Sequence, residues 1–115
     1  MKTHAFPKAN RILKRKEYLA LSKNGKRLYS KAFIAIIDTD SIQNRLGVTV
    51  SKKVGKAAER NRIKRFIREY FRLNRDKIQG FWKINIIAKK SAGEATHQEV
   101  NASLNHIFKT LYKAK

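Results

Sequence analysis

The sequence of 115 residues contains no cysteine, so it can form no disulfide and offers no thiolate to hold zinc or to act as a nucleophile. Proline occurs once, at Pro7, and the five glycines are scattered, so no proline- or glycine-rich linker divides the chain. No apolar run approaches the roughly 18 residues of a membrane-spanning helix. The first ten residues are polar and lack the apolar centre of a secretory signal. These absences predict one domain over residues 1–115, with residues 1–10 as a flexible terminus.

Acidic residues are scarce as well. The chain has 8 Asp and Glu residues against 28 Lys and Arg residues, which gives a formal net charge of +20 at pH 7. Acid–base or metal-ion catalysis needs carboxylates or histidines placed together, and neither the acidic residues nor His4, His97 and His106 show such a spacing. The spacing of a nucleotide-hydrolysing P-loop is absent too. The sequence therefore predicts no catalytic centre in this chain, and its charge indicates a polyanionic or acidic partner: RNA, DNA or anionic lipid.

Hydrophobic residues make up 42% of the sequence, which is enough for a small core and too much for a disordered basic tail. The last helix is predicted to begin at a capping box, with Thr96 as N-cap and Glu99 three residues later. Two strands joined through a helix favour a parallel pair. Periodicity predicts the following order of elements: a helix over 14–23, a strand over 32–37, a loop over 38–44, a strand over 46–51, a helix over 57–74, a strand over 83–88 and the last helix from 96.

The helix predicted over 57–74 carries the most information. Five apolar residues recur at helical spacing and form one stripe: Ile63, Phe66, Ile67, Tyr70 and Phe71. Five cations share an arc beside this stripe: Arg60, Lys64, Arg65, Arg68 and Arg72. Both acids of the helix, Glu59 and Glu69, lie off this arc, and Arg62 lies apart from it. A solvated helix face usually alternates acids with bases four residues apart, whereas like charges at this spacing indicate a surface that binds a polyanion.

The loop before this helix adds three lysines at the end of a predicted strand: Lys52, Lys53 and Lys56. Unpaired backbone N–H groups at the start of a helix favour anions, and Gly55 allows a tight turn from strand to helix. From the residues alone, the chain is an RNA- or DNA-binding module without a catalytic centre of its own.

The segment 45–69 resembles the signature of the bacterial ribonuclease P protein subunit. Its run Arg60-Asn61-Arg62-x-Lys64-Arg65-x-x-Arg68-Glu69 matches that family's RNR motif without a gap, and length, charge and element order agree over nearly the whole chain. The resemblance implies an α+β fold, a two-layer α-β sandwich in which three helices accompany a small mixed sheet of about four strands. It also implies the order α-β-β-β-α-β-α, a further segment near 27–31 that precedes or extends the first strand, and a left-handed crossover, against the usual right-handed preference.

The function implied by the resemblance is that of the protein subunit of a ribonucleoprotein that removes the 5′ leader from precursor tRNA. The chemistry in this family belongs to a large catalytic RNA and to Mg2+ ions held mainly by that RNA, with none bound by the protein alone. We therefore expect a cytoplasmic ribonucleoprotein of one protein and one RNA, with no membrane partner. Nine residues are predicted to bind RNA: Lys52, Lys53, Lys56, Arg60, Asn61, Arg62, Lys64, Arg65 and Arg68. Three are predicted to line a cleft for the single-stranded leader: Tyr18, Ile34 and Ile36.

Two positions depart from the family pattern. Ser22 stands where relatives often carry a second aromatic residue, and Ile36 stands where some carry tyrosine. Stacking on an aromatic ring is worth about 1–3 kcal/mol per base, so leader contacts are expected to be weaker or differently distributed here. For Tyr18 the alternative is ordinary packing of a helix on the sheet. Phe33 and Ile37 alternate with the cleft positions and are assigned to the core.

Two other classes of function stay open on the sequence. A non-catalytic RNA-binding or ribosome-associated protein of similar fold would also bind structured RNA, but it would not prefer precursor to mature tRNA. A basic peripheral membrane protein would need an apolar face free to enter lipid, whereas the core needs the apolar stripe of the helix over 57–74.

Overall fold

The computed structural model describes residues 11–12, 14–40 and 43–112, so the terminus over 1–10, predicted to be flexible, lies outside the described residues. Three short 3-10 helices connect the main elements of this part of the chain: η2 (Lys52–Val54), η3 (Arg75–Lys77) and η4 (Lys90–Gly93). The main elements follow the order α1 (Arg15–Asn24), β1 (Lys26–Tyr29), β2 (Phe33–Thr39), β3 (Arg45–Thr49), α2 (Ala57–Asn74), β4 (Trp82–Ala88) and α3 (His97–Phe108).

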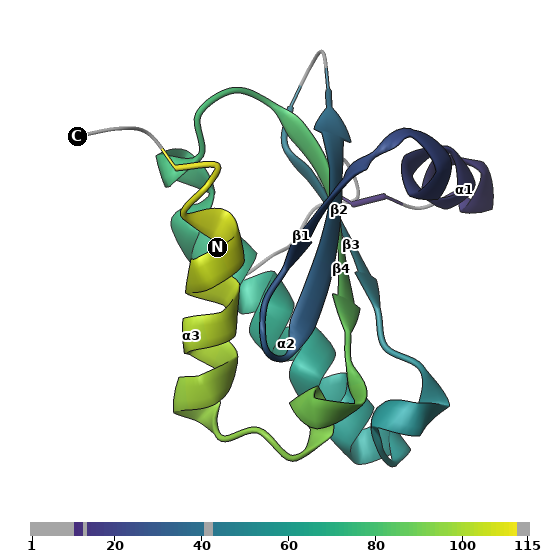
Figure 1. Ribbon diagram of the computed structural model, residues 1–115, viewed down its shortest axis with the longest axis vertical. Helices are drawn as coiled ribbons and strands as arrows, with labels where there is room; N and C mark the ends of the chain where they lie inside the picture. The colour runs from purple at the N-terminus through teal and green to yellow at the C-terminus, as the bar shows by residue number, and fades with distance from the viewer. Residues whose placement is uncertain (1–10, 13, 41–42, 113–115) are drawn as a thin grey trace, which may run out of the picture.

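The strands form one mixed sheet in the order β1-β2-β4-β3. β2 pairs antiparallel with β1 and with β4, whereas β3 pairs parallel with β4. The parallel pair is joined through α2, as the strand–helix–strand pattern predicted. α2 and α3 lie on one side of the sheet and form the two predicted layers with it, while α1 packs on the opposite side (Figure 1). The predicted α+β sandwich is confirmed.

The helix boundaries agree closely with those predicted. α2 has the predicted bounds, and α3 begins after Thr96. The Thr96 hydroxyl accepts a hydrogen bond from the Glu99 backbone N–H at 3.1 Å, and the Glu99 carboxylate accepts one from the Thr96 N–H at 2.8 Å. This capping box satisfies backbone donors that have no partner within the helix.

The strand boundaries differ more from the prediction. β2 continues to Thr39 because its last two residues pair with Trp82 and Lys83 of β4, so the loop predicted over 38–44 is shorter. β3 ends at Thr49, since the chain then turns into η2. β1 is a short strand at the edge of the sheet whose residues are mostly exposed. It therefore lacks the apolar alternation that reveals a strand in the sequence, and only the family resemblance indicated a segment there.

The main core fills the space between the sheet and the two helices α2 and α3. Phe33 and Ile37 lie in this core, as predicted from strand alternation. Each such side chain contributes about 1.5–3 kcal/mol on burial. The apolar stripe of α2 is thereby turned toward the sheet, and the two flanks of the helix remain for other contacts. Large, fully buried side chains include Phe33, Ile63, Ile67, Phe71, Ile84, Ile86, Leu104 and Phe108.

A smaller apolar cluster docks α1 on the other side of the sheet. Ile12, Leu21 and Ile36 are buried in this cluster, and Tyr18 and Ile87 pack against it. The two clusters lie on opposite faces of β2, because neighbouring residues of a strand point to opposite sides of the sheet. α1 is thus held by contacts with the sheet, on the face opposite to the one that α2 and α3 cover.

Candidate nucleic-acid interface

Three lysines cluster where β3 leads into α2. Lys52 and Lys53 lie in η2, Lys56 is the N-cap of α2, and all three are exposed. The start of α2 is less open to an anion than the sequence predicted, because the Glu59 carboxylate accepts a hydrogen bond from the Lys56 backbone N–H at 3.1 Å. A carboxylate thus occupies part of the positive end of the helix, and contacts with phosphates at this point depend on the lysine side chains.

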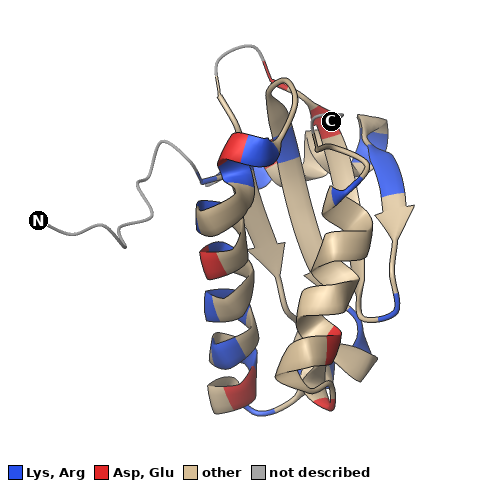
Figure 2. Ribbon diagram, turned by 90° about the vertical axis from the view of Figure 1, so that its left-hand side faces the viewer, with Lys and Arg blue, Asp and Glu red and all other residues tan. Residues whose placement is uncertain are grey.

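Cations follow one another along α2 (Figure 2). Four of them form no ion pair with any acidic residue of the described ranges: Arg60, Lys64, Arg65 and Arg68. The fifth cation of the predicted acid-free arc differs. Arg72 donates from Nε and Nη2 to Glu69 at 3.0 and 2.6 Å, and these bonds raise the pKa of Arg72. The prediction of an arc without acids is wrong at Arg72, because side chains three residues apart meet on a helix surface.

The predicted RNA-binding residues occupy both flanks of α2. Burial raises the pKa of Tyr18 in α1 and the charge of Arg68 opposes that rise, so Arg68 lies on the flank of α2 that faces α1. Arg62 lines a groove between α2 and α3, on the opposite flank. Asn61 is exposed between them. One helix therefore presents its cations to two separate regions of the surface.

Tyr18 lies against β3, directly over Gly47. A Cβ atom at Gly47 would lie 2.6 Å from the Tyr18 hydroxyl oxygen and 2.7 Å from a ring carbon, so only glycine leaves room for the ring. Burial raises the pKa of Tyr18, while a hydrogen bond with the backbone of Val48 and the charge of Arg68 oppose that rise. Tyr18 is thus held where α1, β3 and α2 meet.

A strip of partly apolar surface crosses the sheet on the side of α1. One residue from each strand contributes to it, and the four are register partners: Tyr29, Ile34, Ile87 and Thr49. Within this sheet strip Ile34 and Ile87 are half-buried, whereas Tyr29 is 58% exposed. Neighbouring strands lie about 4.8 Å apart, so the strip spans about 14 Å. The sequence indicated only Ile34, because the common row of the other three depends on strand order and register.

Ile36 lies deeper than the sheet strip. It is 3% exposed and is buried together with Leu21 and Ile12, so it packs beneath α1. Ile34 is therefore the one of the two predicted sheet positions that has accessible surface. Ser22, where α1 departs from the family pattern, is exposed.

The cation at the start of β3 holds α1 in place. Arg45 Nη2 lies 2.7 Å from Glu17 Oε2, and Arg45 Nε lies 2.9 Å from Asp40 Oδ2. Burial opposes the ionisation of Glu17, but the Arg45 guanidinium outweighs burial and lowers the pKa of Glu17 below its ordinary value. The three side chains tie α1, the end of β2 and β3 together, and this fixes the position of Tyr18.

The described ranges contain no group of three histidine, cysteine or acidic side chains that could hold a metal ion. Within the same part of the chain, no helix is long and apolar enough to cross a membrane. The surface instead combines cations suited to phosphates with an adjacent strip and tyrosines suited to unstacked bases. Such a combination fits single-stranded nucleic acid beside a larger polyanion.

Comparison with known proteins leads to the same class. The family model described as Ribonuclease P matches residues 6–112. The ribonuclease P protein component of Desulforapulum autotrophicum is 45% identical over 99% of this chain and 98% of its own length, and that of Desulfosudis oleivorans is 49% identical over 94% and 90%. The structure of the Staphylococcus aureus RNase P protein superposes with a TM-score of 0.85 at 33% identity, covering 92% of this chain and 100% of that chain. The chain belongs to the ribonuclease P protein family.

Ribonuclease P proteins work with an RNA subunit in the endonucleolytic removal of the 5′ leader from precursor tRNA, and this is the function of the chain. The enzyme depends on Mg2+, and catalysis in the family is carried by the RNA. Both the family resemblance and the predicted fold class are confirmed. Membership of this family favours the ribonuclease P subunit over the two alternatives that the sequence left open.

Proposed function

We propose that the cations of α2 and of the preceding loop bind phosphates of the RNA subunit. The guanidinium group suits phosphate because it offers several donors in a fixed plane, and acid-free stretches of α2 keep these donors available. Neutralising phosphates releases counterions, which is the usual source of affinity in such complexes. The proposed RNA face comprises Lys52, Lys53, Lys56, Arg60, Asn61, Arg62, Lys64, Arg65 and Arg68.

We propose that the 5′ leader crosses the sheet strip, beginning at Tyr18. The observation that carries this proposal is the close packing of Tyr18 on Gly47 of β3, because it sets an aromatic ring beside the strip on the flank of α2 that carries Arg68. Ile34 provides an apolar floor, and Ile36 supports α1 from below. Tyr29 lies exposed at the far end of the strip and supplies a second aromatic ring, which α1 lacks at Ser22. Single-stranded RNA is commonly bound by stacking its bases on such rings.

In this proposal Mg2+ is held mainly by RNA. Mg2+ prefers oxygen ligands and keeps several waters, and the phosphates of two RNA molecules offer far more oxygens than the 8 acidic residues of the chain. The protein contributes its positive field, which reduces repulsion between the RNA subunit and the precursor. One protein acts with one RNA subunit in the cytoplasm, and it binds no metal ion by itself.

The test measures the affinity of the holoenzyme for precursor tRNAs with leaders of increasing length and for mature tRNA. Tyr29→Ala should weaken the binding of precursors with long leaders by about 1–3 kcal/mol if one base stacks on it. Precursors with short leaders and mature tRNA should be unaffected, because Tyr29 lies at the far end of the strip. Phe81→Ala is the matched control, since Phe81 is 50% exposed outside the strip. An equal loss for mature tRNA would contradict this path of the leader.

A further inference from the structure

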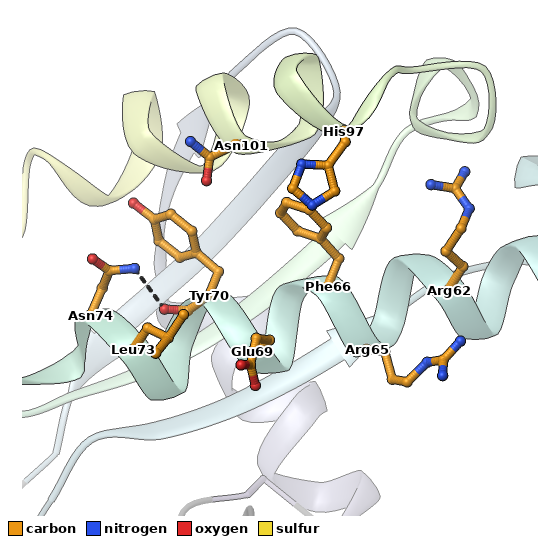
Figure 3. Close-up of a pocket in the computed structure, with 9 residues that line it drawn as sticks. All are labelled: Arg62, Arg65, Phe66, Glu69, Tyr70, Leu73, Asn74, His97 and Asn101. Atoms are coloured by element: carbon orange, nitrogen blue, oxygen red, sulfur yellow. Dashed lines mark hydrogen bonds between the residues drawn. The ribbon is translucent and has the colours of Figure 1, made fainter. Parts of the chain in front are cut away.

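A groove separates α2 from α3 on the flank of α2 that faces away from Tyr18. Its volume is about 510 Å3, which lies within the range of sites for small ligands. Phe66 and Leu73 of α2 face His97 and Asn101 of α3 across it (Figure 3). None of these four side chains belongs to the proposed RNA face or to the sheet strip. We call this site the helix groove.

Flat and apolar surfaces line the helix groove. The rings of Phe66 and His97 meet edge to face, with centroids 4.4 Å apart and an interplanar angle of 72°. Leu73 is 61% exposed and projects from α2 about two turns beyond Phe66. An apolar surface of this kind is available to a planar ring, because nothing in the described part of the chain covers Leu73.

The two walls of the helix groove differ in charge. Arg62, Arg65 and Glu69 line it from α2, and the Glu69 carboxylate is paired with Arg72, so this wall keeps a positive charge. By contrast, α3 carries no lysine or arginine between His97 and Phe108 in a chain that has 28 such residues. Instead α3 offers His97 and the amide of Asn101. A groove for the phosphate backbone alone would be expected to carry cations on both walls. One cationic wall and one neutral, hydrogen-bonding wall match the two halves of a nucleotide, its phosphate and its base.

The shape of the helix groove is set before any ligand enters. The Tyr70 hydroxyl of α2 bonds with the Asn105 amide oxygen of α3 and lies 2.6 Å from the hydroxyl of Tyr112. The rings of Tyr70 and Phe108 also meet, with centroids 5.2 Å apart. These contacts fix the spacing of the two helices, and a preformed site loses less entropy on binding.

We propose that the helix groove takes up one unstacked base of the RNA subunit. Its phosphate contacts Arg62 and Arg65, its ring packs on Leu73 and the Phe66–His97 pair, and the Asn101 amide reads an edge of the base. The inference rests on the proposed RNA face, to which both arginines belong, and adds a contact with a base to its contacts with phosphates. A leader base is excluded because the sheet strip lies on the other flank of α2. A second copy of the chain fits poorly, since two chains of charge +20 repel each other.

The experiment compares assembly of the RNA subunit with the wild-type protein and with a Leu73→Ala/Asn101→Ala variant over a range of salt concentrations. The variant should lower the affinity about five- to 160-fold, which corresponds to the loss of one stacked base. The slope of log affinity against log salt should stay unchanged, because no phosphate contact is removed. Leu19→Ala is the matched control, since Leu19 is 57% exposed on α1, and it should assemble as the wild type does.

Two outcomes would overturn this inference. An unchanged affinity of a variant that unfolds at the wild-type temperature would show that no base enters the helix groove. Dimerisation of the free wild-type protein, abolished in the Leu73→Ala/Asn101→Ala variant, would assign the groove to a second copy. Failure of the RNA face itself is distinguishable, because it would leave the salt slope of an Arg60→Ala variant unchanged. Arg60 belongs to the RNA face and does not line the helix groove, so the loss of affinity in the Leu73→Ala/Asn101→Ala variant is measured independently of it.

Discussion

The position of the Tyr18 ring depends on a residue that the sequence did not indicate as part of the site. Gly47 leaves room for the Tyr18 ring on β3, and Arg68 lies beside the same ring. A single absent side chain therefore decides how closely α1 approaches the sheet. The two readings of Tyr18, packing on the sheet and stacking on a base, are compatible in this geometry, because one face of a ring can pack while its remaining surface stays accessible.

Gly47→Ala should displace Tyr18 from β3, since the new methyl group would lie 2.6 Å from its hydroxyl oxygen. We expect weaker binding of precursor tRNA to the holoenzyme, by about 1–3 kcal/mol if a stacked base is lost, and little change for mature tRNA. Tyr18→Phe is the control, because it keeps the ring and loses only the hydrogen bond with the Val48 backbone. Wild-type affinity of the Gly47→Ala holoenzyme for precursor tRNA would refute the role of this packing.

Residue types and spacing made some site residues predictable and left others hidden. The cations of α2 were predicted because they stand in a continuous motif, and Tyr18 was predicted because the family resemblance assigns an aromatic residue of the leader cleft to its position. Tyr29, Ile87 and Gly47 could not be found in this way, because each acquires its role from a neighbouring strand. Only the register of β1, β2, β4 and β3 brings them to one face.

α2 divides the surface into two regions. Its core stripe packs on the sheet, one flank faces α1 through Arg68, and the other faces α3 through Arg62. The helix itself was predictable in full, because the regular spacing of its apolar residues indicates both the length of the helix and the side that is buried. The pairing of Arg72 with Glu69 was not predictable, since the angular position of a residue on a helix does not show how far its long side chain extends.

This pairing supplies a matched control within one helix. Arg68→Ala should weaken assembly with the RNA subunit and reduce the slope of log affinity against log salt by about 0.7–0.9 per lost phosphate contact. Arg72→Ala, one turn further along, should leave the slope unchanged, because Glu69 already holds its guanidinium. Binding titrations at several salt concentrations measure both slopes. Equal slopes for the two variants would show that Arg68 makes no phosphate contact.

Across the whole molecule, the scarce acids hold elements together. Glu17 and Asp40 form ion pairs with Arg45. Glu59 and Glu99 accept hydrogen bonds from backbone N–H groups at the start of α2 and α3. These carboxylates pair with groups inside the fold, and the cations still exceed the acids by 20 charges. The fold thus keeps a strong positive field despite the self-repulsion that such a charge brings.

The Glu17–Arg45 ion pair, which joins α1 to β3, should make the free energy of unfolding depend on pH. The pKa of Glu17 is lowered in the folded protein, so its stabilising effect is present above its ordinary pKa of 4.5 and is lost as the pH falls through the lower folded value. Glu17→Gln should cost about 1 kcal/mol of unfolding free energy at pH 7, and this difference should vanish toward pH 3. Urea unfolding at both pH values measures it. A difference that persists undiminished at pH 3 would contradict a stabilising role of the Glu17 charge.

The order β1-β2-β4-β3 places the last strand of the chain in the interior of the sheet. Until β4 has left the ribosome, β2 and β3 have no common neighbour, and neither the parallel pair nor the sheet strip can form. Contacts between distant parts of a chain form late in folding. A growing chain that ends before Trp82 therefore carries the cations of α2 without the surface that orients them, and the protein becomes ready for its RNA only after β4 has been synthesised.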